Sequence, residues 1–115
     1  MTSAYSNPFS PLNTDPPSFQ MAVTEEWPLG LDFTDDLGPG DAVTEPIETT
    51  LYDTTAGALV TLADSPTIFE NTVVQIVRGS ALTLGHNYRL EATAKLNTQK
   101  VATTALVIQC SVPAP

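Results

Sequence analysis

The single histidine and the single cysteine of this 115-residue chain, His86 and Cys110, are the side chains best suited to act as general base and nucleophile near neutral pH. His86 lies in a turn at residues 84–87, and Cys110 lies on the apolar side of an alternating segment. We therefore interpret both as structural, and we expect neither enzymatic activity nor a cofactor. One cysteine and one histidine also exclude an intrachain disulfide and a structural zinc site.

A group of aspartates is the densest set of possible metal ligands: Asp32, Asp35, Asp36 and Asp41. Their oxygens suit Ca²⁺, but the acidic residues occupy positions 1, 4, 5 and 10 with no Glu at position 12, which does not match an EF-hand loop. Alternatively, Asp32 is the solvent-facing residue of a strand and the other three hydrogen-bond within a turn rich in Gly and Pro. We favour this alternative and expect no metal site, and the four aspartates are the candidate ligands if a metal does bind.

The charge of the chain is strongly negative and unevenly distributed. The formal net charge is −9, which disfavours binding to nucleic acid and to anionic membrane surfaces. No apolar run is long enough to span a bilayer, and residues 1–5 do not resemble a signal peptide, so we expect a chain that is not exported. Residues 1–77 carry no Lys or Arg, and all four basic residues follow. If these segments lie on different faces, head-to-tail contact between copies would pair acidic with basic surface. The alternative is that the acidic part only keeps the protein soluble.

Three of the basic residues, Arg89, Lys95 and Lys100, are our candidates for a partner-binding surface. Arg89, Glu91 and Lys95 fall on the polar side of one alternating segment. Arg89 and Glu91 are then either an exposed ion pair of little energetic value or half of an intersubunit contact. The partner would be another copy of the chain or a different protein with complementary charge.

Residues 1–18 form a segment unlike the rest. Seven of the ten prolines lie in the first 46 residues, which excludes helix there and predicts extended backbone. The segment has few aliphatic side chains, so we expect an arm without a core of its own, either disordered alone or docked on a neighbour through spaced apolar residues. Those candidate anchors are Tyr5, Phe9 and Leu12.

Residues 19–115 form the predicted domain, in which apolar and polar residues alternate. This period of two is typical of half-buried strands and occurs at residues 29–33, 88–96 and 106–112. Thr, Val and Ile predict further strands at residues 20–24, 42–52, 58–62 and 72–77. About seven strands separated by Gly, Pro and Asp turns predict an all-β, antiparallel sandwich with at most one short helical turn.

Several motifs along this domain give the chain a family resemblance. An acidic, Pro-containing lead at residues 25–28 precedes the Asp32-Phe33 pair, a Gly-Asp turn at residues 37–41 and a strand beginning with Val43. Gly79, Gly85 and Tyr88 follow, ahead of a final strand at residues 106–112. Over residues 29–112 the chain thus resembles small virion proteins of tailed bacteriophages, the fiber–tail adaptor proteins. The resemblance implies an Ig-like β-sandwich and non-enzymatic work in assembly.

The sequence therefore predicts a structural protein of a phage virion, assembled in the host cytoplasm. It would be an adaptor that links tail and fiber or head–tail components through its arm and sheet surfaces, with other virion proteins and copies of itself as partners. A capsid cement (decoration) protein is the alternative. A further alternative, a Ca²⁺- or carbohydrate-binding β-sandwich module, would use residues 32–41 and exposed aromatic rings.

Overall fold

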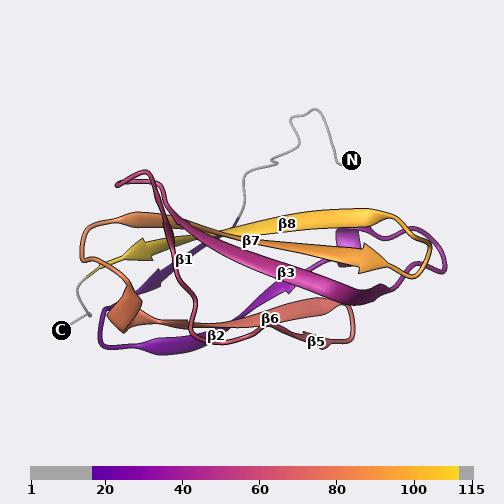
Figure 1. The fold of residues 1–115 in the computed structure, drawn as a ribbon, viewed down its shortest axis with the longest axis horizontal. Coiled ribbons are helices and arrows are strands. Elements are labelled where there is room, and N and C mark those ends of the chain that lie inside the picture. Colours follow the sequence, from indigo (N-terminus) through magenta and orange to yellow (C-terminus); the bar gives the residue numbers. More distant parts are fainter. Residues whose placement is uncertain (1–16, 112–115) are drawn as a thin grey trace.

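Eight β-strands in two sheets make up most of residues 17–111, the part of the chain that the computed structural model describes (Figure 1). Two short 3₁₀ helices, Thr34–Asp36 and Gly79–Ala81, join strands. The strands in chain order are β1 (Ser18–Met21), β2 (Glu26–Asp32), β3 (Val43–Asp53), β4 (Ala58–Val60), β5 (Thr67–Phe69), β6 (Thr72–Arg78), β7 (Asn87–Leu96) and β8 (Val101–Cys110). No helix within these residues is long and apolar enough to cross a membrane.

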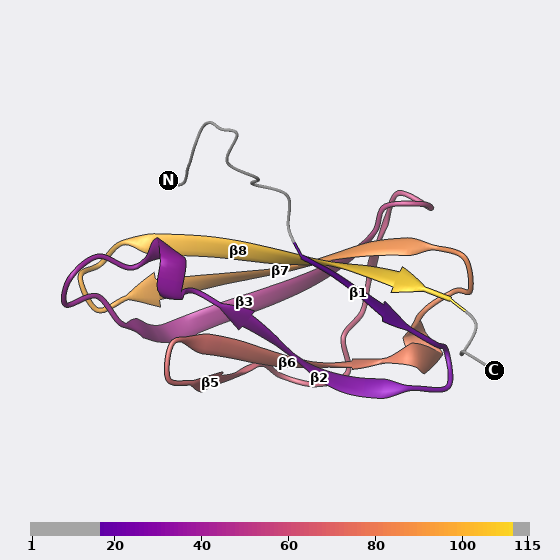
Figure 2. The same ribbon diagram turned by 180° about the vertical axis from the view of Figure 1, so that it is seen from behind.

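The larger sheet has the strand order β1-β8-β7-β3-β4, and the smaller sheet has the order β2-β6-β5. All neighbouring strands are antiparallel except β1, which runs parallel to β8, so the prediction of a purely antiparallel fold is wrong at this one pair. Figure 2 shows β1 beside β8, after which the chain crosses to β2 in the other layer. The fold is thus all-β and sandwich-like, as the sequence predicts at this level.

The core lies between the two sheets and is filled by alternate residues of the strands. In β7, every second residue from Tyr88 to Leu96 is at most 2% exposed, which confirms the alternation predicted for this segment. Leu29 and Leu31 of β2 pack into the same cluster from the smaller sheet. Each fully buried side chain of this size contributes about 1.5–3 kcal/mol through removal of apolar surface from water.

The predicted number of strands is one too low, and the boundaries of several strands differ, including the start of β2 at Glu26 and the end of β4 at Val60. The additional strand, β5, has only three residues and pairs with β6 at one edge. β1 begins at Ser18, inside the segment that we expected to be arm. β8 begins at Val101 rather than at residue 106, because a tight turn returns the chain onto β7, where the Leu96 amide donates to the Lys100 carbonyl.

Two backbone segments approach closely at the end of β6, where Gly79 meets the connection between β1 and β2. The Gly79 amide donates to the Glu25 carbonyl at 2.7 Å, and a Cβ atom at position 79 would overlap the carbonyl oxygens of Ala22 and Glu25. Only glycine fits there without displacing the backbone. Nearby, the hydroxyl of buried Tyr88 accepts a hydrogen bond of 2.6 Å from the Thr83 amide. These two contacts fix the connection from β6 to β7.

Candidate functional site

The outer face of the larger sheet carries Arg89 and Lys95, as the alternation of β7 predicts. Arg89 lies between Tyr52 of β3 and Val107 of β8, and its Nε donates to Glu91 Oε2 at 2.7 Å. Both side chains are more than two-fifths exposed, so solvent screens the pair and it adds little to stability. Within the described residues the pair lies exposed on one face of β7, and a contact of these residues with another subunit stays a prediction.

The three predicted basic residues do not form one continuous stripe. Lys95 lies six residues beyond Arg89 on β7, which is about 20 Å along an extended strand. Lys100 lies in the turn that follows and approaches its own chain's Asp41, with 4.0 Å between Nζ and Oδ2. The structure therefore groups Lys95 with Lys100 at one end of the sheet and leaves Arg89 at the other. The predicted arm anchors Tyr5, Phe9 and Leu12 lie outside the described residues.

The aspartates of residues 32–41 hydrogen-bond within their own turns. Asp32 Oδ1 accepts from the Thr34 hydroxyl at 2.6 Å and from the Thr34 amide at 2.9 Å, and these bonds lower the pKa of Asp32. The pKa of Asp41 is likewise lowered, mainly by the hydrogen bond that its Oδ2 accepts from the Gly38 amide. A second, smaller cause is the bond that its Oδ1 accepts from the Thr98 hydroxyl. Both carboxylates thus have local donors as partners.

The other two aspartates, Asp35 and Asp36, form no metal-ligand cluster that the described residues show. Asp35 is exposed in the 3₁₀ helix, and the side chain of Asp36 is outside the description. Among the described residues, no group of three or more His, Cys, Asp or Glu side chains has an arrangement that could hold a metal ion. The geometry that is visible here is that of turn-stabilising aspartates.

A hydrogen bond between His86 and Asp53, which the sequence did not predict, joins two turns at one end of the larger sheet. His86 Nδ1 lies 2.7 Å from Asp53 Oδ2, and Asp53 Oδ1 accepts from the amides of Thr55 and Ala56. Burial alone would raise the pKa of Asp53, but the hydrogen bonds from His86 and Ala56 and the His86 charge outweigh it and hold this pKa below its usual value. The pair fastens the β3–β4 turn to the start of β7.

The cysteine next to this region is not arranged as a nucleophile. Cys110 is 3% exposed in the core, and burial raises the pKa of its thiol, which keeps the thiol protonated. Its backbone amide donates to the His86 carbonyl, so the two residues are linked through the main chain. A structural role for His86 and Cys110 stays a prediction.

Arg78 forms a second unpredicted connection, at the opposite layer. Its guanidinium contacts both carboxylate oxygens of Asp64, at 2.8 and 3.0 Å, and Glu26 Oε1 at 2.8 Å. These contacts join β6 to β2 and to the segment that crosses between the sheets. They also lower the pKa of Asp64 and raise that of Arg78, because each partner stabilises the charged form of the other.

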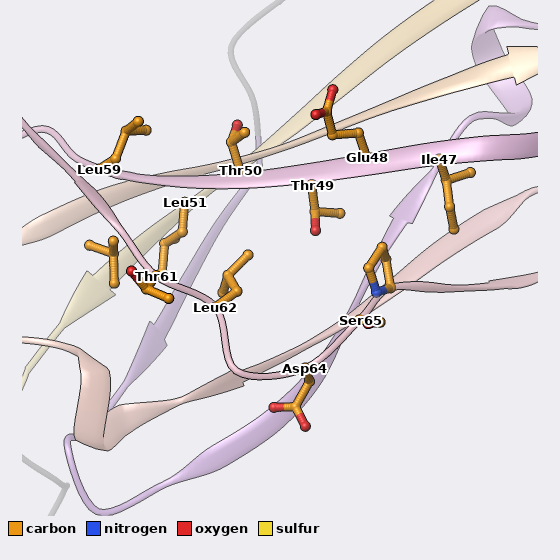
Figure 3. A pocket seen from close by; sticks show the side chains of 12 residues that line it. Ile47, Glu48, Thr49, Thr50, Leu51, Leu59, Thr61, Leu62, Asp64 and Ser65 are labelled. Atoms are coloured by element: carbon orange, nitrogen blue, oxygen red, sulfur yellow. The ribbon is translucent and has the colours of Figure 1, made fainter.

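A groove of about 470 Å³ opens between β3 and the crossing segment, as Figure 3 shows. Residues 47–51 line one side, and residues 59–62 and 64–66 line the other. The amide of buried Gln75 ties the two sides together, since its Oε1 accepts from the Thr49 hydroxyl and its Nε2 donates to the Asp64 carbonyl at 2.9 Å. Gln75 of the smaller sheet therefore fixes the position of the two sides of the groove relative to each other through hydrogen bonds.

Comparisons with known proteins identify no relative. No protein-family model matches the chain, and neither a curated protein nor a solved structure matches it significantly.

Proposed function

We propose that this chain is a non-enzymatic structural protein of a tailed-phage virion, an adaptor that links tail, fiber or head–tail components through its arm and sheet surfaces. The observation that carries the proposal is the placement of β1, the strand that follows the arm, at a sheet edge. β1 is the outermost strand beside β8, and the Pro17 carbonyl accepts from the Val107 amide at 2.8 Å. The arm is thus joined in sequence to an edge strand of the larger sheet.

An Ig-like topology is the finer fold assignment that we propose. In such domains one sheet contains strands G, F and C, and the other contains B, E and D. The order β8-β7-β3 opposite β2-β6-β5 supports this assignment if β2 is strand B and β8 is strand G. The hydrogen bond from the Thr83 amide to the Tyr88 hydroxyl also supports it, because Ig-like domains carry a tyrosine corner at the start of strand F.

The proposal of a non-enzymatic role is supported by the state of the residues that could do chemistry. His86 is engaged by Asp53, and the Cys110 thiol is protonated within the core. The carbohydrate- or Ca²⁺-binding alternative is less well supported, since Asp32 and Asp41 accept hydrogen bonds in their own turns. Trp27 also meets the ring of Phe19 edge to face, with 5.9 Å between the ring centres.

Quantitative mass spectrometry of purified particles, from a host that carries the coding sequence, tests this function. A tail or connector adaptor predicts a small, ring-sized copy number per particle. A copy number comparable with that of the major capsid protein would instead identify a capsid cement protein. Absence of the chain from purified particles, with abundant chain in the lysate, would contradict both virion roles.

A further inference from the structure

The edge of β3 that faces the groove has main-chain groups without a strand partner. Successive residues of an antiparallel strand direct their N–H and C=O groups to opposite sides. The Thr54 amide donates to the carbonyl of Asn87, the first residue of β7, so the even-numbered residues in this part of β3 direct their backbone groups toward β7. The backbone groups of the odd-numbered Ile47 and Thr49 therefore face away from β7. Within residues 17–111, neither residue has a β4 residue opposite it, because β4 pairs with β3 only over Leu51–Asp53.

This open stretch of β3 is short and bounded at both ends. On one side β4 covers Leu51–Asp53. On the other side the pairing with β7 shifts register between Thr44 and Ile47, where Pro46 has no N–H to offer. A bulge with a proline is a common way to protect a strand edge from unwanted pairing. Residues 47–50 therefore form a window of about 13 Å that the fold leaves unprotected.

The side chains around the window suit an uncharged, extended segment. Ile47 and Leu62 are half-buried and face the groove, as Figure 3 shows. The acidic group on the groove's far wall, Asp64, has its charge compensated by Arg78. Glu48 is exposed and lies between Ile47 and Thr49 in the sequence, so its side chain points to the opposite face of the strand from theirs.

We infer that this window accepts the N-terminal arm of a second copy of the chain as an added β-strand. Residues 1–14 carry no charged side chain, and residues 1–7 contain no proline, so each of their amides from residue 2 on can donate. Pairing would place the backbone of residues 2–6 beside Ile47 and Thr49, with Tyr5 as the apolar side chain that enters the groove. This inference rests on the proposed function and names one partner for the arm.

The positions of donor and acceptor favour a second copy over the same chain. The arm leaves from β1, whereas the window lies on β3, three strands away in the same sheet. The same chain would have to fold its arm back across β8 and β7 to reach its own window. A donor at one edge and an acceptor near the opposite edge instead give a head-to-tail contact, which repeats from copy to copy and closes into a ring or extends as a filament.

Amide hydrogen exchange of the unmodified full-length protein, followed by NMR at low and high protein concentration, tests the inference. We expect the amides of Ile47 and Thr49 to exchange at least about tenfold more slowly at high concentration, since pairing shields them. The Thr50 amide, which faces β7, is the internal control and should be protected at both concentrations. Protection that does not depend on concentration would place the chain's own arm in the groove. Fast exchange throughout would show an empty groove, and either result overturns the inference.

Disulfide trapping gives an independent check in full-length chains. Isotope-labelled Ser3→Cys protein, which keeps Tyr5, is mixed with unlabelled Thr61→Cys protein, and Thr61 is chosen because it is exposed on the groove wall. We expect a disulfide between positions 3 and 61 of differently labelled chains to form at least about tenfold faster than with Ala81→Cys, an exposed control away from the groove. Equal rates would contradict the inference. Such a failure would leave the virion role intact, because mass spectrometry of particles tests that role separately.

Discussion

Replacement of Leu90 by alanine should severely destabilise the domain, because this side chain lies at the centre of the larger sheet. Leu90 is fully buried in the middle of β7, opposite Leu51 of β3 and Leu106 of β8. A buried leucine truncated to alanine loses its transfer free energy and leaves a cavity, for a cost of about 2–4 kcal/mol. In a domain of about 100 residues this lowers the melting temperature by roughly 10–20 °C.

Thr93→Ala on the same strand is the matched control. Thr93 lies three residues further along and on the opposite face, where its hydroxyl contacts the Thr103 hydroxyl at 3.1 Å in an exposed position. Its loss should change the free energy of unfolding by no more than about 0.5 kcal/mol. Urea and thermal unfolding of both variants, monitored by circular dichroism, measures the two costs. Equal costs, or a larger cost for Thr93→Ala, would refute the assignment of the two faces of β7.

Three further predictions concern contacts that hold the connections. Tyr88→Phe leaves the Thr83 amide without its partner and should cost about 1–3 kcal/mol in chemical unfolding, whereas an unchanged midpoint would show that water replaces the hydroxyl. Gly79→Ala forces two backbone segments apart and should cost at least about 1–3 kcal/mol, so unaltered stability would contradict the close approach described. The pKa of Asp53 lies below its usual 3.8, so its stabilising effect is complete above that pH and is lost as the pH falls through the lowered value. Melting temperatures should accordingly fall more steeply below about pH 4 for the native chain than for Asp53→Asn, and parallel curves would show that Asp53 does not contribute in this way.

The fold class could be read from the sequence because it depends on local alternation. The period of two from Tyr88 to Leu96 predicts which face of β7 is buried, and the structure confirms it. The alternation does not predict the early part of β8, because residues 102–105 are only Ala and Thr and form a strand by pairing with β7. The parallel pairing of β1 with β8 leaves no local signal, since Phe19 and Ile108 are 89 residues apart.

The interactions at the candidate site were less predictable because they join distant segments. Asp53 and His86 are separated by 33 residues, and each looks like an ordinary turn residue on its own. Arg78 is the first basic residue in the sequence, but nothing in the residues around it indicates that it binds Asp64 and Glu26. The open window on β3 depends on β4 ending at Val60, and nothing in the composition of residues 58–62 predicts that end.

The occupancy of an arm-deleted chain in purified particles tests the central claim most directly. The deletion should remove residues 1–16, because Pro17 already bonds to Val107 and Ser18 begins β1. We predict that the shortened chain melts at the temperature of the full-length chain but is nearly absent from particles that incorporate the full-length chain. Occupancy equal to that of the full-length chain would contradict the account of an adaptor that assembles through its arm.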